Sequence, residues 1–176
     1  INRGIWGSEC TITTGLKEFD VSVSLPGEHM IYNALAATAV GNLLGLSVEQ
    51  IKAGIEKVKP VEGRSNLISK NGIVVIDDCY NANPVSMKSA LDLLCQAVTP
   101  KVAILGDMFE LGENEVDFHR EIGTYAMEIG IDTLICIGQL SRDMAEAANA
   151  CVLLHPGTDV FYFKNKEEFF EKYTDL

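Results

Sequence analysis

The residues with the most chemical potential in this sequence follow a short apolar run, Ile73–Ile76. Asp77 and Asp78 come directly after it, and Asn81 and Asn83 follow at once. The run is rich in β-branched residues and predicts a buried strand. In open α/β sheets, ligands bind outside the carboxyl ends of the strands. This polar cluster therefore predicts a binding site.

The members of this cluster are expected to differ in role. If the strand continues, Asp77 and Asp78 point to opposite faces. One could accept hydrogen bonds from a sugar hydroxyl or the backbone of the next loop. The other could bind a cation or have a structural role, and a structural role is expected for one of the two. Asn81 and Asn83 carry donors and acceptors that suit a ligand with amide and carboxylate groups. Alternatively, one of them caps the helix that Pro84 opens.

Two further predicted strands end in glycine and polar residues. Gly106-Asp107-Met108 follows one, and Gly138-Gln139 follows the other. In a parallel sheet all three exits, including Asp77-Asp78, are expected at one edge. Gly138-Gln139 can be explained as an ordinary polar loop, without a binding role. An aspartate pair and a Gly-Asp-Met turn are more than an ordinary loop requires, so they indicate a binding role.

Isolated polar residues give weaker signals. Arg64 follows Gly63 at a presumed domain junction, where its planar fork could bind phosphate, although a linker arginine is usually solvated. His29 precedes a helix and shares a face with Asn33, and a cap or packing role explains it equally well. His119 lies on the apolar face of a predicted helix and is expected to be a packing residue.

The pattern after residue 64 alternates between strands and helices. This alternation predicts an α/β fold with a mostly parallel, Rossmann-like sheet and helices on both faces. The expected strands are Asn66–Ser69, Ile73–Ile76, Val102–Leu105, Thr133–Ile137 and Val160–Phe163. The expected helices are Pro84–Val98, Glu115–Ile129, Ser141–Asn149 and Lys166–Tyr173.

Residues 1–62 predict a different arrangement, with two short strands and two helices. The strands are expected at Cys10–Thr14 and Phe19–Leu25, and the helices at Ile31–Leu44 and Val48–Val58. No complete GxxxxGK[ST] loop is present. This piece is expected to be the end of a larger domain, and residues 63–176 a second domain, either complete or truncated at its end.

Composition excludes several classes of protein. The formal net charge of −11 argues against a nucleic-acid surface, which needs clustered basic residues. No apolar run is long enough for a membrane span, and the first residues do not form a signal peptide. The five cysteines form no CxxC pair and predict reduced thiols in the cytoplasm.

Four ordered strings closely resemble the Mur ligases: PGEHMIYNALAA from Pro26, the pair Gly63-Arg64, IDDCYNANP from Ile76, and ILGDMFELGE from Ile104 with His119 beyond it. The resemblance covers nearly the whole chain. It implies that residues 1–62 end a central P-loop ATP-binding domain and that residues 63–176 form the C-terminal Rossmann-like domain. The YNANP and GDMxELG strings point to the member that adds D-alanyl-D-alanine to UDP-N-acetylmuramoyl-tripeptide.

The resemblance implies an ATP-dependent amide-bond ligase of peptidoglycan precursor synthesis, which serves cell shape and cell division. ATP phosphorylates the tripeptide carboxylate, and the dipeptide amine attacks the acyl phosphate. Mg²⁺ is implied with ATP, with its ligands mainly outside this chain. We expect a cytoplasmic monomer, no nucleic-acid partner, no membrane insertion, and no ligase activity from these residues alone.

The family also implies roles for particular residues. Arg64 matches a catalytic arginine that reaches the ATP phosphates, and Asp78 an aspartate that contacts the ribose. His29 and Asn33 match a nucleotide-binding pair, but Met30 stands where many relatives have asparagine. The residues expected to bind the dipeptide are Tyr80, Asn81, Asn83, Asp107, Met108 and Glu110.

Other classes of protein share parts of this pattern. A receiver-type signalling module also has an acidic pair after its first strand, but it needs an aspartate after its third strand, where this chain has Gly138-Gln139. A dinucleotide-binding oxidoreductase needs GxGxxG, which follows none of the predicted strands. A non-catalytic nucleotide- or peptide-binding module is the remaining alternative.

Overall fold

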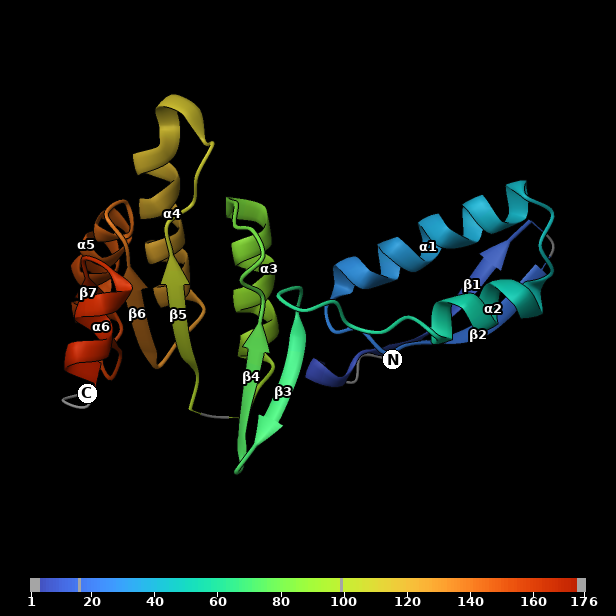
Figure 1. Cartoon of the computed structure of the whole chain (residues 1–176), viewed down its shortest axis with the longest axis horizontal. Coiled ribbons are helices and arrows are strands. Elements are labelled where there is room, and N and C mark those ends of the chain that lie inside the picture. Colours follow the sequence, from blue (N-terminus) through green and yellow to red (C-terminus); the bar gives the residue numbers. More distant parts are fainter. Residues whose placement is uncertain (1–3, 16, 99, 174–176) are drawn as a thin grey trace. The chain divides into compact units, whose positions relative to one another are not determined.

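The computed structural model describes residues 4–15, 17–98 and 100–173. The chain divides into two compact units, Ile1–Tyr80 and Asn81–Leu176, each with its own elements (Figure 1). In the described part of the chain, no helix combines the length and apolarity that crossing a bilayer requires.

The first unit begins with a two-stranded antiparallel sheet against which two helices pack. Its elements are η1 (Gly4–Trp6), β1 (Ser8–Thr14), β2 (Lys17–Val23), α1 (Glu28–Leu43) and α2 (Val48–Glu56). Apolar side chains from the sheet and both helices form one core. Its buried members are Ile12, Phe19, Val21, Val23, Ala34, Ile51 and Ile55.

Local signals set the ends of these helices. Ser47 and Gln50 form a reciprocal capping box at the start of α2, as the sequence predicted. Gly45 lies in the left-handed region at φ 74° just beyond α1, where a side chain would be strained. The N–H groups of Gly45 and Leu46 bond the carbonyls of Asn42 and Gly41 and so close the helix end.

A hairpin of β3 (Asn66–Lys70) and β4 (Ile73–Asp77) completes the first unit. Asn71 and Gly72 turn the chain between them, with φ values of 54° and 80° that fit a type I′ turn. The prediction that the apolar run is a buried strand is wrong: Ile73, Val74 and Val75 are 40–66% exposed. Within the described residues β4 pairs only with β3.

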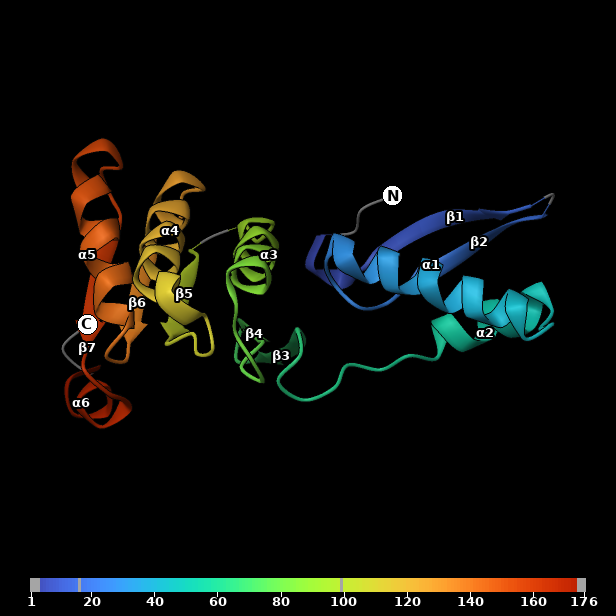
Figure 2. The same cartoon turned by 90° about the horizontal axis from the view of Figure 1, so that it is seen from above.

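The second unit is built around a parallel sheet of three strands in the order β5 (Val102–Gly106), β6 (Thr133–Ile137) and β7 (Asp159–Phe163). Figure 2 shows α4 and α5 on one side of this sheet and α6 on the other, which confirms the predicted fold class. The remaining elements are α3 (Pro84–Cys95), η2 (Gly112–Asn114), α4 (Glu115–Glu128), α5 (Ser141–Cys151), η3 (Val152–Leu154) and α6 (Lys166–Lys172).

Close packing of α4 against α5 organises the core of this unit. Ile122, Met127 and Met144 are fully buried in it, together with Leu134 of β6. The two helices approach so closely that a Cβ added at Gly123 would overlap the carbonyl oxygen of Met144. A glycine is therefore required at this point of contact.

The sheet brings together two of the three polar strand exits that were expected at one edge. The exits of β5 and β6 are adjacent, because parallel neighbours end at the same edge. The third exit, Asp77-Asp78, follows a strand of the antiparallel hairpin in the first unit. The parallel sheet therefore brings together the exits of β5 and β6, and a shared edge with Asp77 and Asp78 stays a prediction.

Candidate functional site

In the first unit, the two aspartates at the end of β4 hold the turn that carries Arg64. Asp77 Oδ2 accepts a hydrogen bond from the N–H of Gly63 at 3.1 Å. Asp78 Oδ1 accepts one from the N–H of Ser65 at 2.8 Å. The backbone on both sides of Arg64 is therefore fixed by carboxylates, and Asp77 has the structural role that the sequence favoured for one of the pair.

The side chain of Arg64 lies on the ring of Tyr80. Its guanidinium carbon is 4.0 Å from the ring centroid, a cation–π contact. The N–H of Tyr80 donates to the carbonyl of Gly63 at 3.0 Å, which ties the ring to the same turn. In the described part of the chain Arg64 forms no ion pair, so its N–H groups are available to an anion.

Two further residues contribute to this turn, of which Ser65 was not identified from the sequence. Ser65 has φ 47° although it is not a glycine, and it is buried. Cys79 lies beside Asp77, and their hydrogen bond lowers the pKa of the Asp77 carboxyl and raises that of the Cys79 thiol. Neither residue type has a sequence signal that would mark it.

The predicted nucleotide-binding pair lies at the start of α1. His29 is half-buried with its ring against Gly27, where an added Cβ would come within 2.5 Å of it. Asn33 Nδ2 is 3.4 Å from the sulfur of Met30. Asn33 also lines an apolar cavity of about 340 Å³ between α1 and α2.

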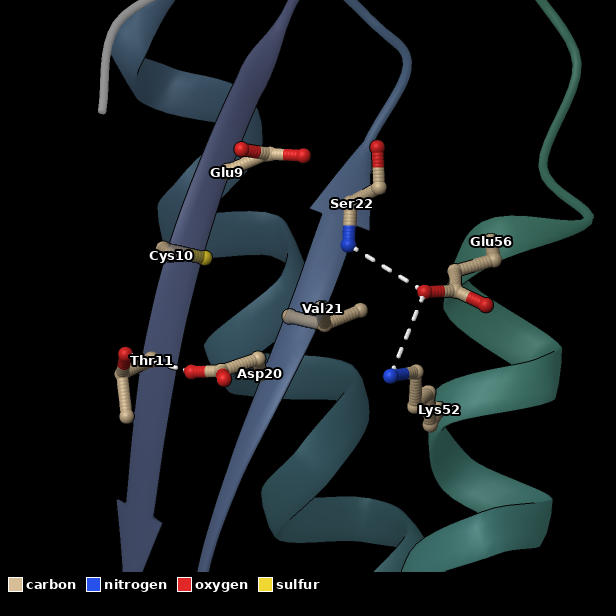
Figure 3. A pocket seen from close by; sticks show the side chains of 8 residues that line it. All are labelled: Glu9, Cys10, Thr11, Asp20, Val21, Ser22, Lys52 and Glu56. Carbon is tan, nitrogen blue, oxygen red and sulfur yellow. Dashed lines mark hydrogen bonds and ion pairs between the residues drawn. The ribbon is translucent and has the colours of Figure 1, made fainter.

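A second cavity in this unit, of about 420 Å³, lies outside every predicted site (Figure 3). It is acidic, but its side chains largely satisfy one another. Asp20 accepts from the hydroxyl of Thr11 at 2.7 Å, and Glu56 lies 3.8 Å from Lys52. In the described residues, no three potential ligands gather in a way that could hold a metal ion.

In the second unit, both predicted asparagines make local hydrogen bonds. Asn83 Oδ1 accepts from the N–H of Ser86 at 2.9 Å, and Ser86 Oγ accepts from the N–H of Asn83 at 3.0 Å. Asn83 is thus the N-cap of α3, the alternative the sequence left open. Asn81 Oδ1 accepts from the N–H of Ala82 at 2.9 Å. In the described part of the chain neither amide nitrogen donates a hydrogen bond, so each remains available to a ligand.

Asp107, at the exit of β5, binds the loop that follows β6. Its carboxylate accepts from the N–H of Gln139 at 3.0 Å, and from the N–H and hydroxyl of Ser141 at 2.7 Å each. Gly138 is needed here because an added Cβ would overlap this carboxylate. Asp107 therefore accepts hydrogen bonds from Gln139 and Ser141 at the start of α5, and these bonds connect the loop after β5 to the loop after β6.

The remaining predicted residues of this loop divide into buried and exposed ones. Met108 is 0% exposed and its side chain packs in the core, so its predicted contact with a substrate stays a prediction that only its backbone could fulfil. Glu110 is exposed and has φ 61°, in the left-handed region. The neighbouring Phe109 is 69% exposed and was not identified from the sequence.

His119 supports this loop through a hydrogen bond to its backbone. It is 0% exposed, and its Nε2 accepts from the N–H of Met108 at 3.0 Å. Its Nδ1 lies 2.7 Å from the carbonyl oxygen of Glu115 and must donate to it. The ring is therefore the neutral Nδ1–H tautomer, and the expected packing residue is also a hydrogen-bonded support of the loop.

These features define the second unit as a Rossmann-like α/β domain with polar loops at the carboxyl edge of its parallel sheet. Residues 63–176 match the family model described as Mur ligase, glutamate ligase domain. The chain belongs to the Mur ligase family. Because the chain belongs to this family, it is neither a receiver-type signalling module nor a dinucleotide-binding oxidoreductase domain.

The similar curated proteins are named UDP-N-acetylmuramoyl-tripeptide–D-alanyl-D-alanine ligase. The one from Escherichia coli K12 is 37% identical over 143 residues, which are 81% of this chain and 32% of that protein. The one from Bacillus subtilis is 36% identical over 129 residues, 72% of this chain and 28% of that protein. The chain thus spans about a third of the length of these relatives.

Solved structures agree with this assignment. A crystal structure of MurF from Acinetobacter baumannii matches 98% of this chain and 42% of that chain, with a TM-score of 0.78 and 29% identity. A MurF ligase from Thermotoga maritima in complex with ADP matches with a TM-score of 0.71 at 22% identity, a likeness that concerns the fold.

Proposed function

We propose that this chain is part of an ATP-dependent ligase that adds D-alanyl-D-alanine to UDP-N-acetylmuramoyl-tripeptide in peptidoglycan precursor synthesis. The observation that carries the proposal is the 37% identity over 143 residues to the Escherichia coli ligase of that name. In this proposal residues 1–62 end a central ATP-binding domain and residues 63–176 form the C-terminal domain. The reaction takes place in the cytoplasm, and the enzyme acts as a monomer.

In the proposed mechanism, Arg64 is the catalytic residue of this chain. Its guanidinium is exposed, free of ion pairs in the described residues, and held on a turn fixed at both sides. A guanidinium placed at the γ-phosphate stabilises charge that develops during phosphoryl transfer to the tripeptide carboxylate. The planar guanidinium suits this task because two of its N–H groups can bind two phosphate oxygens at once.

Different residues are proposed to bind the nucleotide and the dipeptide. Asp78 is proposed to contact the ribose with the carboxylate oxygen that does not hold Ser65, and His29 and Asn33 to contact the nucleotide. The solved Thermotoga maritima MurF ligase is in complex with ADP, which supports ATP as the proposed cofactor. Mg²⁺ would screen the phosphates when bound, through ligands mainly outside these residues.

The dipeptide residues are proposed at the loops of the second unit. Asn81 and Asn83 offer amide N–H groups to its carboxylate or peptide carbonyl. Asp107 fixes the Gly106–Glu113 loop, and the exposed Glu110 of this loop is proposed to contact the dipeptide. The chemistry further requires both substrates to be aligned and water to be excluded.

The direct test is an assay of the complete protein that contains this chain. Phosphate release should require ATP, Mg²⁺, the UDP-linked tripeptide and D-alanyl-D-alanine together. Arg64→Ala should lower kcat by about a hundredfold or more, the range found when a charge-stabilising donor is removed. The dipeptide KM should change much less. An unchanged kcat in this variant would remove Arg64 from the mechanism.

The 176-residue chain alone is expected to be inactive. A complete protein that does not join the dipeptide to the tripeptide would refute the proposed function. Measurable turnover by the isolated chain would refute the expectation that the remaining part of the enzyme is required.

A further inference from the structure

The turn that carries Arg64 contains an unusual backbone conformation. Ser65 has φ 47°, in the left-handed region that non-glycine residues rarely adopt. Asn71 has a similar φ of 54°, but it lies in a hairpin turn beside Gly72, where that conformation is the ordinary solution. Ser65 is instead 5% exposed, directly after the arginine.

Contacts from Asp78, just after β4, and from within the turn maintain this conformation. The N–H of Ser65 is held by Asp78 at 2.8 Å, and its hydroxyl lies 3.4 Å from the same oxygen. The N–H of Arg64 donates to the carbonyl of Val61 at 3.0 Å. Strain that surrounding contacts maintain is typical of residues that present a functional group. Here the group presented is the Arg64 side chain.

The ring of Tyr80 then limits where that side chain can lie. With the guanidinium carbon over the ring and 4.0 Å from its centroid, the positive charge of Arg64 lies against one face of Tyr80. The N–H groups lie around the edge of the guanidinium, which stacking does not block. Tyr80 is 67% exposed, so the ring holds no core position that would explain it.

We propose that Tyr80 is a positioning residue for Arg64: its ring holds the guanidinium on the turn fixed by Asp77 and Asp78, with the N–H edge turned to an incoming phosphate. This inference rests on the proposed function only for the identity of that phosphate. It replaces direct contact with the dipeptide as the main role of Tyr80. An aromatic ring is required at residue 80, and the phenol hydroxyl is not.

The kinetic test compares three variants of the complete protein. Tyr80→Leu should lower kcat by about tenfold, because small displacements of a reacting group are costly, while the dipeptide KM stays within about twofold. Tyr80→Phe should recover most of that loss. Phe170→Leu is the matched control, since Phe170 is an aromatic residue of similar exposure at 66%, and it should leave kcat unchanged.

Three results would overturn the proposal. Tyr80→Leu could keep the kcat of the natural protein, Tyr80→Phe could be as impaired as Tyr80→Leu, or the dipeptide KM could rise while kcat is unchanged. The last result would mean that Tyr80 contacts the dipeptide. Thermal unfolding of each variant checks that the protein still folds.

A spectroscopic readout separates this proposal from the proposed function. In the complete protein labelled at arginine, the ring of Tyr80 should shift the side-chain protons of Arg64 upfield, with the signal assigned by Arg64→Lys. Tyr80→Leu should abolish the shift and Tyr80→Phe should retain it. If the shift is present but the natural protein has no ligase activity, the proposed function fails. If ligase activity is present without the shift, the positioning role fails.

Discussion

Asp107 and Ser141 are joined by two hydrogen bonds to one oxygen: the N–H and the hydroxyl of Ser141 both donate to Asp107 Oδ1 at 2.7 Å. Asp107 lies at the exit of β5, and Ser141 is the first residue of α5. A carboxylate from a neighbouring strand therefore caps this helix and complements the positive end of its dipole. This relationship gives Asp107 a structural role in addition to the proposed substrate role.

The first prediction concerns this contact. Asp107→Asn places an amide donor where three donors converge, and should destabilise the protein by about 1–3 kcal/mol. Asp143→Asn is the control on the same helix. Among the described residues the ion pair of Asp143 is with Arg120, whose side chain is 54% exposed, so its loss should cost less than about 1 kcal/mol. Urea unfolding followed by circular dichroism measures both. Equal effects would contradict the cap assigned to Asp107.

The second prediction concerns His119 beneath the Gly106–Glu113 loop. His119→Leu leaves the buried N–H of Met108 without its acceptor and should cost about 1–3 kcal/mol. His155→Leu, a half-buried histidine outside the loop, should cost much less. Nitrogen NMR should show the Nδ1–H tautomer for His119 in the natural protein. Observation of the Nε2–H tautomer would contradict the hydrogen bond from Met108.

The third prediction compares two glycines in helices. Gly123→Ala should destabilise the protein by about 1–3 kcal/mol, because the new Cβ overlaps the carbonyl of Met144. Gly54→Ala in α2 has nothing within 4 Å of the added Cβ and should stabilise by roughly 0.5–1 kcal/mol. Opposite shifts of the unfolding midpoint are expected. Shifts of the same sign would contradict the close approach of α4 and α5.

The fourth prediction concerns the reactivity of Cys79. The hydrogen bond with the Asp77 carboxylate, and then its negative charge, raise the pKa of the exposed Cys79 thiol. A thiol with a raised pKa has less thiolate at a given pH, and the thiolate is the nucleophile. Asp77→Asn should therefore speed alkylation of Cys79 and shift its rate profile to lower pH.

Mass spectrometry of the alkylated peptides separates Cys79 from the other thiols. Cys151, which does not contact Asp77, is the internal control and should react at the same rate in both proteins. A slower reaction of Cys79 in Asp77→Asn would contradict the cause assigned to the raised pKa.

The fifth prediction separates the two roles of Asn83. Asn83→Ser keeps an N-cap oxygen for α3 but removes the amide that would meet the dipeptide. The complete enzyme should therefore keep its stability, while the dipeptide KM rises about tenfold and the KM for ATP changes little. Asn165→Ser, at the N-cap of α6, is the control for the cap exchange itself. A KM for the dipeptide that does not change would leave Asn83 as a cap alone.

Most helices and strands could be predicted because their signals are local. The capping box of Ser47 and Gln50, the left-handed Gly45 and the Asn83-Pro84 start of α3 each act within a few residues. The burial of the Ile73–Ile76 run could not be predicted in this way. Burial depends on which elements pack on a strand, and periodicity does not report that.

The contacts of the predicted site residues are what the sequence did not reveal. Residue type and position correctly placed Asp77, Asp78 and Asp107 at strand exits, but not their hydrogen-bond partners. Met108 was expected to meet a substrate, and it packs in the core because the turn after β5 directs it inward. His119 was expected to pack only, and its ring nitrogens proved to be bonded to Met108 and Glu115.

The sequence by itself determined the family, the order of the elements and the residue types at the strand exits, because these depend on ordered motifs and short-range patterns. The tertiary structure alone decided that Ser65 adopts a left-handed conformation, that Arg64 stacks on Tyr80, and that Asp107 caps α5. The physical reason is that each of these features joins residues far apart in the chain. Such contacts depend on backbone directions that local propensities do not encode.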